Sequence, residues 1–158
     1  MKTQANYTIL ILLFFMISCS SSKTTPDSIR KISQKIESKN YVVSMSNAYP
    51  MRMQPVFLSS GYQMTLKNDS AFTYLPYYGV LHSAPMDNRE GGIKFAEPLN
   101  DYSIKSNKKS NGWDIHFKIY AKQFIYDVSM KVFDNASASV TFGAYQFDPI
   151  SFSGEIKQ

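Results

Sequence analysis

The sequence is poor in the residues on which redox, metal and histidine chemistry depend. Its 158 residues include one Cys and two His. A single Cys excludes a disulfide framework and a cysteine-rich zinc site, and two His limit histidine-based catalysis and metal binding. The chain also lacks a nucleophile elbow, a phosphate-binding loop and a zinc-protease helix. We therefore expect no cofactor and no metal, and an enzyme is the weakest of the function classes.

Apolar and aromatic residues are present in the amounts that one folded domain needs. Hydrophobic residues make up 44% of the chain, aromatic residues 15% and charged residues 18%. This composition argues against a disordered chain. The length suits a single domain and leaves little room for a second.

The N-terminus has the pattern of an export signal. Lys2 supplies a positive charge, and residues 7–17 are almost continuously apolar. That run is too short for a membrane-spanning helix, which needs about 20 residues, but it has the length of a signal-peptide core. The run ends at Met16-Ile17-Ser18-Cys19, which resembles a bacterial lipobox. Met16 in place of the usual Leu resembles the relaxed lipobox of Bacteroidetes lipoproteins.

Cys19 is the candidate lipidation site. Its thiol can take a diacylglyceryl group and its freed amine an acyl chain such as palmitate, and two or three chains anchor firmly where one does not. We expect residues 1–18 to form a lipoprotein signal peptide, residues 19–26 the lipidated Cys and a flexible tether, and residues 27–158 one domain. The alternatives are an ordinary signal peptide with a chance Cys, or an uncleaved N-terminal anchor.

The residues after Cys19 bear on where the protein is anchored. They include neither an acidic cluster resembling a surface-export signal nor an Asp directly after the Cys, which resembles an inner-membrane retention signal. We therefore expect anchoring to the outer membrane, with the periplasmic face favoured over the cell surface. Nucleic acid is not an expected partner, because the chain leaves the cytoplasm.

A helix is expected at the start of the domain. Pro26-Asp27-Ser28 supplies a start signal, and Ile29, Ile32 and Ile36 form one apolar stripe. The stripe is surrounded by the basic residues Arg30, Lys31, Lys35 and Lys39. We expect the stripe to pack against the domain, and docking of a basic amphipathic helix on anionic lipid is the alternative.

From Tyr41 onward the apolar period changes to two. Apolar and polar residues alternate over 62–67, 113–120, 124–133, 137–142 and 150–156, and Ser70 to Leu75 reads as a further strand. Turn signals occur at 68–69, 111–112, 134–135 and 148–149. Strands of this kind form an antiparallel meander around one core.

The predicted fold is mainly β. An N-terminal α-helix is followed by an antiparallel β-meander of about eight strands, forming either a barrel-like (lipocalin-like) domain or a curled sandwich. A closed barrel of that size fills with side chains or holds one small ligand.

Four segments together resemble the Bacteroidetes lipoprotein family called domain of unknown function 4251. They are Leu75 to Gly79, Gly91 to Phe95, Asp101-Tyr102 and Ile150 to Ile156. The likeness covers approximately Tyr41 to Ile156 and implies the same architecture and an envelope location. Val80 departs from the family pattern, where an Arg commonly follows the Gly, and Asp148-Pro149 replaces a frequent Asn-Arg pair. If those arginines share a binding role, the resemblance implies that this chain lacks it.

Tyr77, Tyr78 and Gly79 are the candidate ligand-binding residues. Pro76 ends or edges a strand, and Gly79 permits a positive φ or a close backbone approach. The two tyrosines would then form an aromatic ledge at a pocket mouth, suited to a sugar ring or an apolar ligand. A strand corner filled by aromatic side chains is the alternative, and it is the favoured one.

The two histidines do not form an evident site. A metal or acid–base role would require His82 and His116 to converge with Asp87, Glu90 or Asp114. Nothing in their spacing requires this, so exposed surface histidines are expected.

Two further surface features are noted. Ser70 and Ser28 lie in Asp-Ser-apolar triplets that resemble the O-glycosylation motif of exported Bacteroidetes proteins. The lysines around the 111–112 turn are Lys105, Lys108 and Lys109. They are expected to be solvated, and contact with anionic lipid or glycan is the alternative.

The function that the sequence favours is a non-enzymatic binding module, in a lipid-anchored protein of the cell envelope, for a small apolar or glycan ligand. The alternative is an envelope scaffold that binds another protein through a sheet edge. An interior cavity above about 300 Å³ would favour the first, and a filled core with an open edge the second.

Overall fold

The computed structural model describes residues 25–83, 91–107, 109, 111–122 and 124–157. The expected signal peptide, Cys19 and most of the tether lie outside the described residues, as do Asp87, Glu90 and Lys108. Within the described ranges, no helix has the length and apolar character needed to cross a membrane.

The helix α2 (Pro26–Glu37) begins where the sequence predicts and packs through its isoleucines. The side chain of Thr25 caps the helix by accepting a hydrogen bond from the backbone N–H of Ser28, and Pro26 occupies the first turn. Ile32 and Ile36 are buried against the barrel, and Ile29 is half-buried. The stripe therefore packs on the domain, as expected, and the helix turns its charged side chains to solvent.

The strands form one antiparallel sheet with the order β5-β4-β3-β1-β10-β9-β8-β7-β6. The strands are β1 (Tyr41–Pro50), β2 (Val56–Phe57), β3 (Gln63–Lys67), β4 (Ser70–Leu75), β5 (Ile93–Pro98), β6 (Asn100–Asn107), β7 (Gly112–Tyr120), β8 (Ile125–Phe133), β9 (Ser137–Ala144) and β10 (Phe147–Ile156). The two-residue β2 pairs with β1 outside the main order. About eight strands were expected, and β2 is too short for a sequence period to show it.

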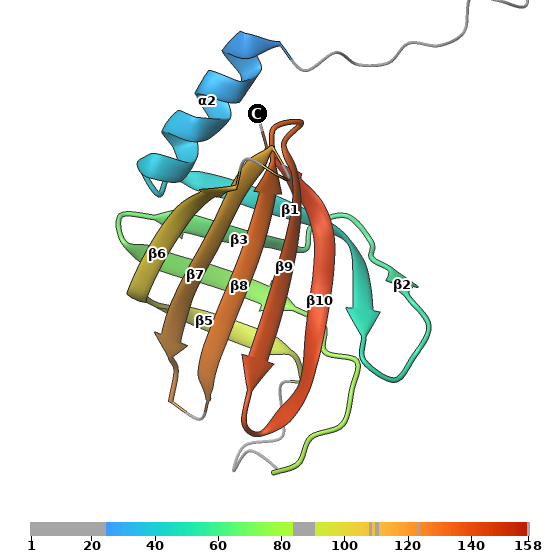
Figure 1. The fold of residues 1–158 in the computed structure, drawn as a ribbon. Coiled ribbons are helices and arrows are strands. Elements are labelled where there is room, and N and C mark those ends of the chain that lie inside the picture. Colours follow the sequence, from blue (N-terminus) through green and yellow to red (C-terminus); the bar gives the residue numbers. More distant parts are fainter. Residues whose placement is uncertain (1–24, 84–90, 108, 110, 123, 158) are drawn as a thin grey trace, which may run out of the picture.

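The sheet is nearly closed into a barrel. β1 and β10, the first and last long strands of the chain, pair with each other, so the end of the meander lies beside its beginning. Figure 1 shows β6 to β10 side by side, with β3 and β5 crossing behind them and α2 at one end. The remaining seam lies between β5 and β6, which follow each other through Leu99 but do not pair.

Aromatic side chains join β5 to the opposite strands of the barrel from the inside. Phe95 on β5 contacts Tyr126 on β8 and Phe142 on β9, with ring centroids 5.2 and 6.2 Å apart. The hydroxyl of Tyr126 also has a hydrogen bond with the backbone of Lys94 on β5. These contacts tie β5 to β8 and β9, strands with which it shares no backbone ladder.

The predicted alternation places apolar residues in the core. Met64 and Leu66 on β3, like Phe142 and Phe152 on β9 and β10, have no exposed surface. Buried apolar side chains therefore occupy the barrel interior, and their burial is the main source of stability. The hairpin turn predicted at 68–69 is also confirmed, since both residues have positive φ values of 50° and 57°.

Candidate functional site

The corner after β4, defined here as residues 76–82, is held together by Tyr77. Its hydroxyl lies 3.1 Å from the carbonyl oxygen of Val80 and 3.0 Å from that of Asp148, and its ring packs edge-on against Phe147 at 5.0 Å. Burial raises the pKa of Tyr77, and the neighbouring Asp148 carboxylate adds to the rise. Tyr77 is thus a packing residue of the corner.

The other two candidate residues support the same corner. Tyr78 is half-buried and packs against the core. A Cβ at position 79 would collide with the ring and hydroxyl of Tyr77, so only glycine fits there without a shift. The geometry favours the structural interpretation of this corner. A ligand-binding role for Tyr77, Tyr78 and Gly79 stays a prediction.

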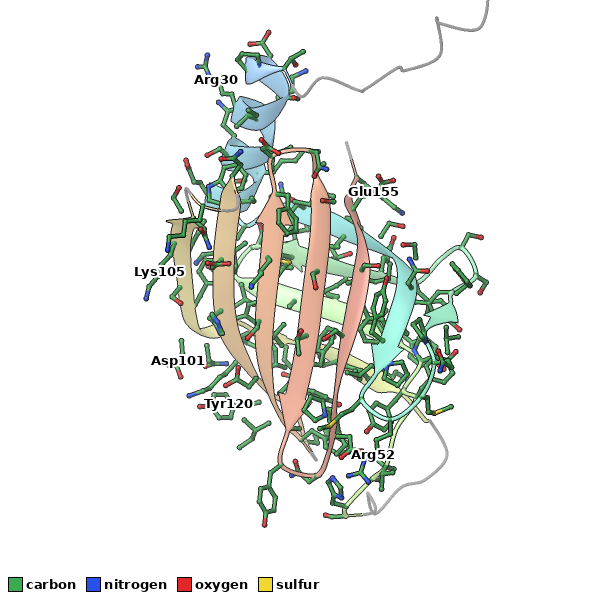
Figure 2. The ribbon with its side chains drawn as sticks, turned by 45° about the vertical axis from the view of Figure 1, so that its right-hand side comes forward. Arg30, Arg52, Asp101, Lys105, Tyr120 and Glu155 are labelled. Atoms are coloured by element: carbon green, nitrogen blue, oxygen red, sulfur yellow. The ribbon has the colours of Figure 1, made fainter. Side chains whose placement is uncertain are left out.

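A buried carboxylate ties the corner to two other segments. The Asp148 side chain is only 6% exposed, and its Oδ1 lies 2.9 Å from Nε2 of His82. Its Oδ2 lies 2.9 Å from Nε of Arg52, an ion pair that lacks hydrogen-bond geometry. The backbone N–H of Asp148 donates to the carbonyl of Val80 at 3.1 Å. Figure 2 shows Arg52 at the end of the barrel opposite Arg30 of α2.

The two departures from the family pattern therefore lie side by side. Val80 and Asp148 are hydrogen-bonded to each other, although 68 positions separate them in the chain. In this chain the cationic side chain near them is Arg52, which comes from the loop after β1.

The two histidines do not meet. His116 is exposed on β7, where its ring lies 3.2 Å from the Ser129 hydroxyl, whereas His82 pairs with Asp148 at the corner. Asp114 accepts a hydrogen bond from Asn107 at 2.7 Å. Among the residues that the structure describes, no three His, Cys, Asp or Glu side chains gather into a metal-binding group.

Both candidate glycosylation sites have partly exposed serines. Ser28 donates its hydroxyl to the carbonyl of Thr25 at 2.7 Å, in the first turn of α2. Ser70 begins β4, opposite Lys67 and Pro98. O-glycosylation at Ser28 and Ser70 stays a prediction. An intact mass above that of the lipidated polypeptide, lost on Ser70→Ala plus Ser28→Ala, would support it, and an unchanged mass would remove it.

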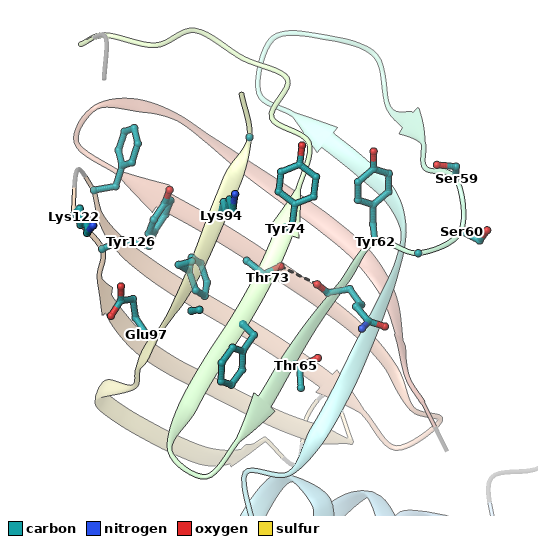
Figure 3. A pocket seen from close by; sticks show the side chains of 18 residues that line it. Ser59, Ser60, Tyr62, Thr65, Thr73, Tyr74, Lys94, Glu97, Lys122 and Tyr126 are labelled. Carbon is teal, nitrogen blue, oxygen red and sulfur yellow. Dashed lines mark hydrogen bonds between the residues drawn. The ribbon is translucent and has the colours of Figure 1, made fainter. Parts of the chain in front are cut away.

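A trough with a volume of about 1080 Å³ lies on the outside of β3, β4 and β5. Its residues were not singled out by the sequence. One wall is the loop before β3, with Ser59, Ser60 and Gly61, and the other is the β7–β8 turn, with Lys122 and Phe124 (Figure 3).

The floor of the trough is a small grid of side chains. Phe72 and Tyr74 of β4 form its central column and are 43% and 55% exposed. Across from Tyr74 lies Lys94 of β5, with its Nζ 5.9 Å from the ring centroid, and Ala96 lies across from Phe72. Thr65 of β3 lies on the other side of Phe72. Polar side chains thus flank two exposed aromatic rings on a rigid sheet.

Tyr126 joins the trough to the core. It lines the trough but is only 2% exposed, because its ring packs against Phe95, Phe124 and Phe147. Burial raises the pKa of Tyr126 to about 12, against the lowering effect of its hydrogen bond with the Lys94 backbone. Its hydroxyl therefore stays protonated at neutral pH, and the floor of the trough is anchored from within.

Over the described residues, the fold and the trough define a mainly β, nearly closed antiparallel barrel with a helix at one end and exposed aromatic side chains on the outside of β4. The chain belongs to the family described as domain of unknown function DUF4251, whose model matches residues 23–156. The expected family is thereby confirmed.

A solved relative shares this fold. The chain is similar to the crystal structure of a DUF4251 family protein from Bacteroides eggerthii, with a TM-score of 0.65 and 14% sequence identity. The match covers 82% of this chain and 87% of that one. No curated protein matches the sequence.

Proposed function

We propose that the protein is a non-enzymatic carbohydrate-binding protein of the bacterial cell envelope, and that the trough holds the sugar chain. The observation that carries this proposal is the exposed pair Phe72 and Tyr74, aligned on one strand between polar neighbours. Sugar rings are amphipathic: their C–H faces stack on aromatic rings, while their hydroxyl groups need hydrogen-bond partners. Rigid aromatic side chains with an apolar body suit that contact.

The spacing of the two rings supports a chain of sugars over a single one. Residues two apart on a strand lie on the same face, about 6.6 Å from each other along it. Phe72 and Tyr74 can therefore stack successive or alternate units of an extended glycan. Gln63 and Thr65 on one side and Lys94 on the other supply hydrogen-bonding groups.

The glycan is favoured over the apolar ligand because of where the open space lies. Buried side chains such as Phe117 and Phe142 occupy the barrel interior, where an apolar ligand would need to sit. The trough is open and has polar side chains along both borders (Figure 3). This combination suits a ligand covered with hydroxyl groups.

The scaffold alternative has less support from the sheet edges. β5 and β6 have unpaired outer edges, which could accept a partner strand. However, β5 is six residues long and ends in Pro98, and β6 carries a register shift next to Asp101, which has a positive φ of 51°. Short edges, proline and bulges are features that discourage strand addition.

The anchoring part of the proposal rests on the lipobox-like segment ending at Cys19. The Cys19→Ser variant should move from the membrane to the soluble fraction, because it cannot receive the diacylglyceryl group. Retention of this variant in the membrane would count against lipidation. That result would not affect the carbohydrate proposal, which is tested by a separate experiment.

Carbohydrate binding is tested with the full chain carrying Cys19→Ser, purified after export and offered to an array of immobilised polysaccharides. We expect binding that falls at least about tenfold in Tyr74→Ala, as for a central aromatic contact. Tyr145→Ala is the matched control, because Tyr145 is 96% exposed but lies in the β9–β10 turn outside the trough. Equal losses in both variants, or no bound polysaccharide, would overturn the proposal.

A further inference from the structure

The methionines that the structure describes fall into two groups. Met45, Met64 and Met130 lie on strands, belong to the core and are 3%, 0% and 1% exposed. Met51 and Met53 lie in the loop between β1 and β2 and are 68% and 58% exposed. The thioether groups of this loop therefore meet solvent, whereas those of the strands do not.

The loop that carries the exposed methionines is attached to the barrel at two points. Arg52 lies between the two methionines, and its Nε is 2.9 Å from Oδ2 of Asp148, whose side chain is only 6% exposed. The pairing of Ala48 with Val56 closes the same loop at its base. Because these contacts hold the loop and neither methionine belongs to the described core, a change in either thioether alters the surface without opening the barrel.

Oxidation by peroxides is the reaction of methionine that depends on such exposure. The thioether sulfur attacks one oxygen of hydrogen peroxide, so that an S–O bond forms and the O–O bond breaks. The proton of the transferred oxygen moves to the departing hydroxide, which leaves as water. The sulfur loses two electrons and the peroxide gains them. The sulfoxide that results is polar, and reductases specific for its two epimers convert it back to the thioether.

We infer that Met51 and Met53 form a reversible oxidation site, at which the folded protein reduces peroxides without losing its structure. A sulfoxide oxygen at either position finds hydrogen-bond partners in water, because both side chains are largely exposed. The same oxygen on Met64 would be a buried polar atom without a partner, which destabilises a core. The site is separate from the trough, since neither exposed methionine is among the described residues that line it.

Access to the site is tested by treating the full chain with hydrogen peroxide and following each methionine by peptide mass spectrometry. Cys19→Ser is used because it removes the only thiol of the chain. We expect Met51 and Met53 to gain oxygen at least about tenfold faster than Met64 in the folded protein, and at an equal rate in urea. Oxidation of Met64 as fast as that of Met51 in the folded protein would overturn the inference. Met86 lies outside the described residues, so no rate is expected for it.

Tolerance of the product is tested on the oxidised protein. With sulfoxides at positions 51 and 53, the melting midpoint should stay within about 3 °C of the untreated value, as for changes at exposed positions. Met51→Leu plus Met53→Leu, which keeps apolar side chains of similar size, should show the same midpoint with and without peroxide. Met64→Leu is the matched control and should respond to peroxide as the parent protein does. A large fall in the midpoint that is absent only from the double variant would overturn the tolerance.

Reversibility is tested by adding methionine sulfoxide reductases of both epimer specificities, with a dithiol as reductant. Each sulfoxide oxygen should leave as water while the dithiol is oxidised to a disulfide, and the masses of the peptides should return to their starting values. Because both side chains are exposed, the reductases should act on the folded protein without urea. Removal of the oxygen atoms only after unfolding, or no removal at all, would overturn the reversible site.

Discussion

Two pairs of aromatic residues lie within seven positions of each other, and the structure uses them in opposite ways. Phe72 and Tyr74 lie on β4 and expose about half of their surface. Tyr77 and Tyr78 follow the strand and turn back against the core. The hydroxyl of Tyr77 is engaged by two backbone carbonyls. The pairs have similar composition, so the residue types alone do not decide which pair is available to a ligand.

The difference arises from strand phase and from the proline between the pairs. On β4 the side chains alternate, and Ala71, Thr73 and Leu75 take the inward positions. Phe72 and Tyr74 must then face outward. Pro76 ends the strand, because it has no N–H for the ladder. The chain bends there, and Tyr77 fills the space against Phe147 at the mouth of the barrel.

The largest expected effect is on stability. Tyr77→Ala should lower the free energy of unfolding by about 3 kcal/mol, since it removes a packed ring and leaves a cavity. Tyr74→Ala should lower it by less than about 1 kcal/mol, as an exposed site does. Urea unfolding of both variants measures the difference. Similar losses would mean that the two tyrosines are not used differently.

The next largest effect is the pH dependence of the free energy of unfolding, which differs between buried and exposed tyrosines. The pKa of Tyr126 is raised to about 12, whereas the unfolded chain titrates near 10. The unfolded state therefore releases a proton first, and stability present below pH 10 is lost as the pH rises from 10 to 12. The contribution of Tyr126 to this loss should be about 2 kcal/mol. Denaturant midpoints across this range measure it.

Tyr126→Phe is the test of that assignment. The variant should unfold with a flatter pH dependence between pH 10 and 12, because the phenol that resists ionisation is gone. Tyr145→Phe, at a fully exposed position, should keep the wild-type slope. A steep slope that persists in Tyr126→Phe would assign the alkaline loss to other groups.

A smaller effect is expected at the polar part of the corner. Asp148→Asn should cost about 1 to 2 kcal/mol, because its partners Arg52 and His82 are both exposed and their attraction is partly screened. Asp101→Asn is the control, since the Asp101–Lys118 pair is exposed on both sides. Thermal melts should show a lower midpoint for Asp148→Asn and an unchanged midpoint for Asp101→Asn. An unchanged melting midpoint in Asp148→Asn would show that Asp148 does not stabilise the corner.

The smallest effect is that of one hydroxyl group. Tyr77→Phe should lower the free energy of unfolding by about 1 kcal/mol, since the ring remains and the hydrogen bonds to Val80 and Asp148 are lost. Binding of polysaccharide should not change. Reduced binding with unchanged stability would move the candidate site back to the corner.

Most of the fold follows from periodicity in the sequence. Strict alternation with one strongly apolar set, as in Ile115, Phe117 and Ile119, identified the strands and their inward faces, and all three are buried. The isoleucine stripe identified the helix and its packed side. The pairing of β1 with β10 could not be predicted from the sequence, because two strands far apart along the chain carry no local signal that they are neighbours.

The trough was missed because β4 is apolar on both faces. Ala71, Thr73 and Leu75 compete with Phe72 and Tyr74 for the inward side, and hydrophobicity alone favours the aromatics. The turn at 68–69 determines which residues of β4 face inward. A two-residue turn pairs Leu66 with Ala71 and Met64 with Thr73, and paired residues share a face. Since Met64 and Leu66 are buried, register assigns the aromatics to the outside.

The most direct test of the account is to map where a glycan binds. Backbone amide shifts of the ¹⁵N-labelled Cys19→Ser protein would be followed while an oligosaccharide of the polysaccharide bound on the array is added. The account predicts that the largest shifts fall on Thr65, Phe72, Tyr74 and Lys94, with little change at 77–82. Shifts centred on 77–82, or none on β3, β4 and β5, would contradict it.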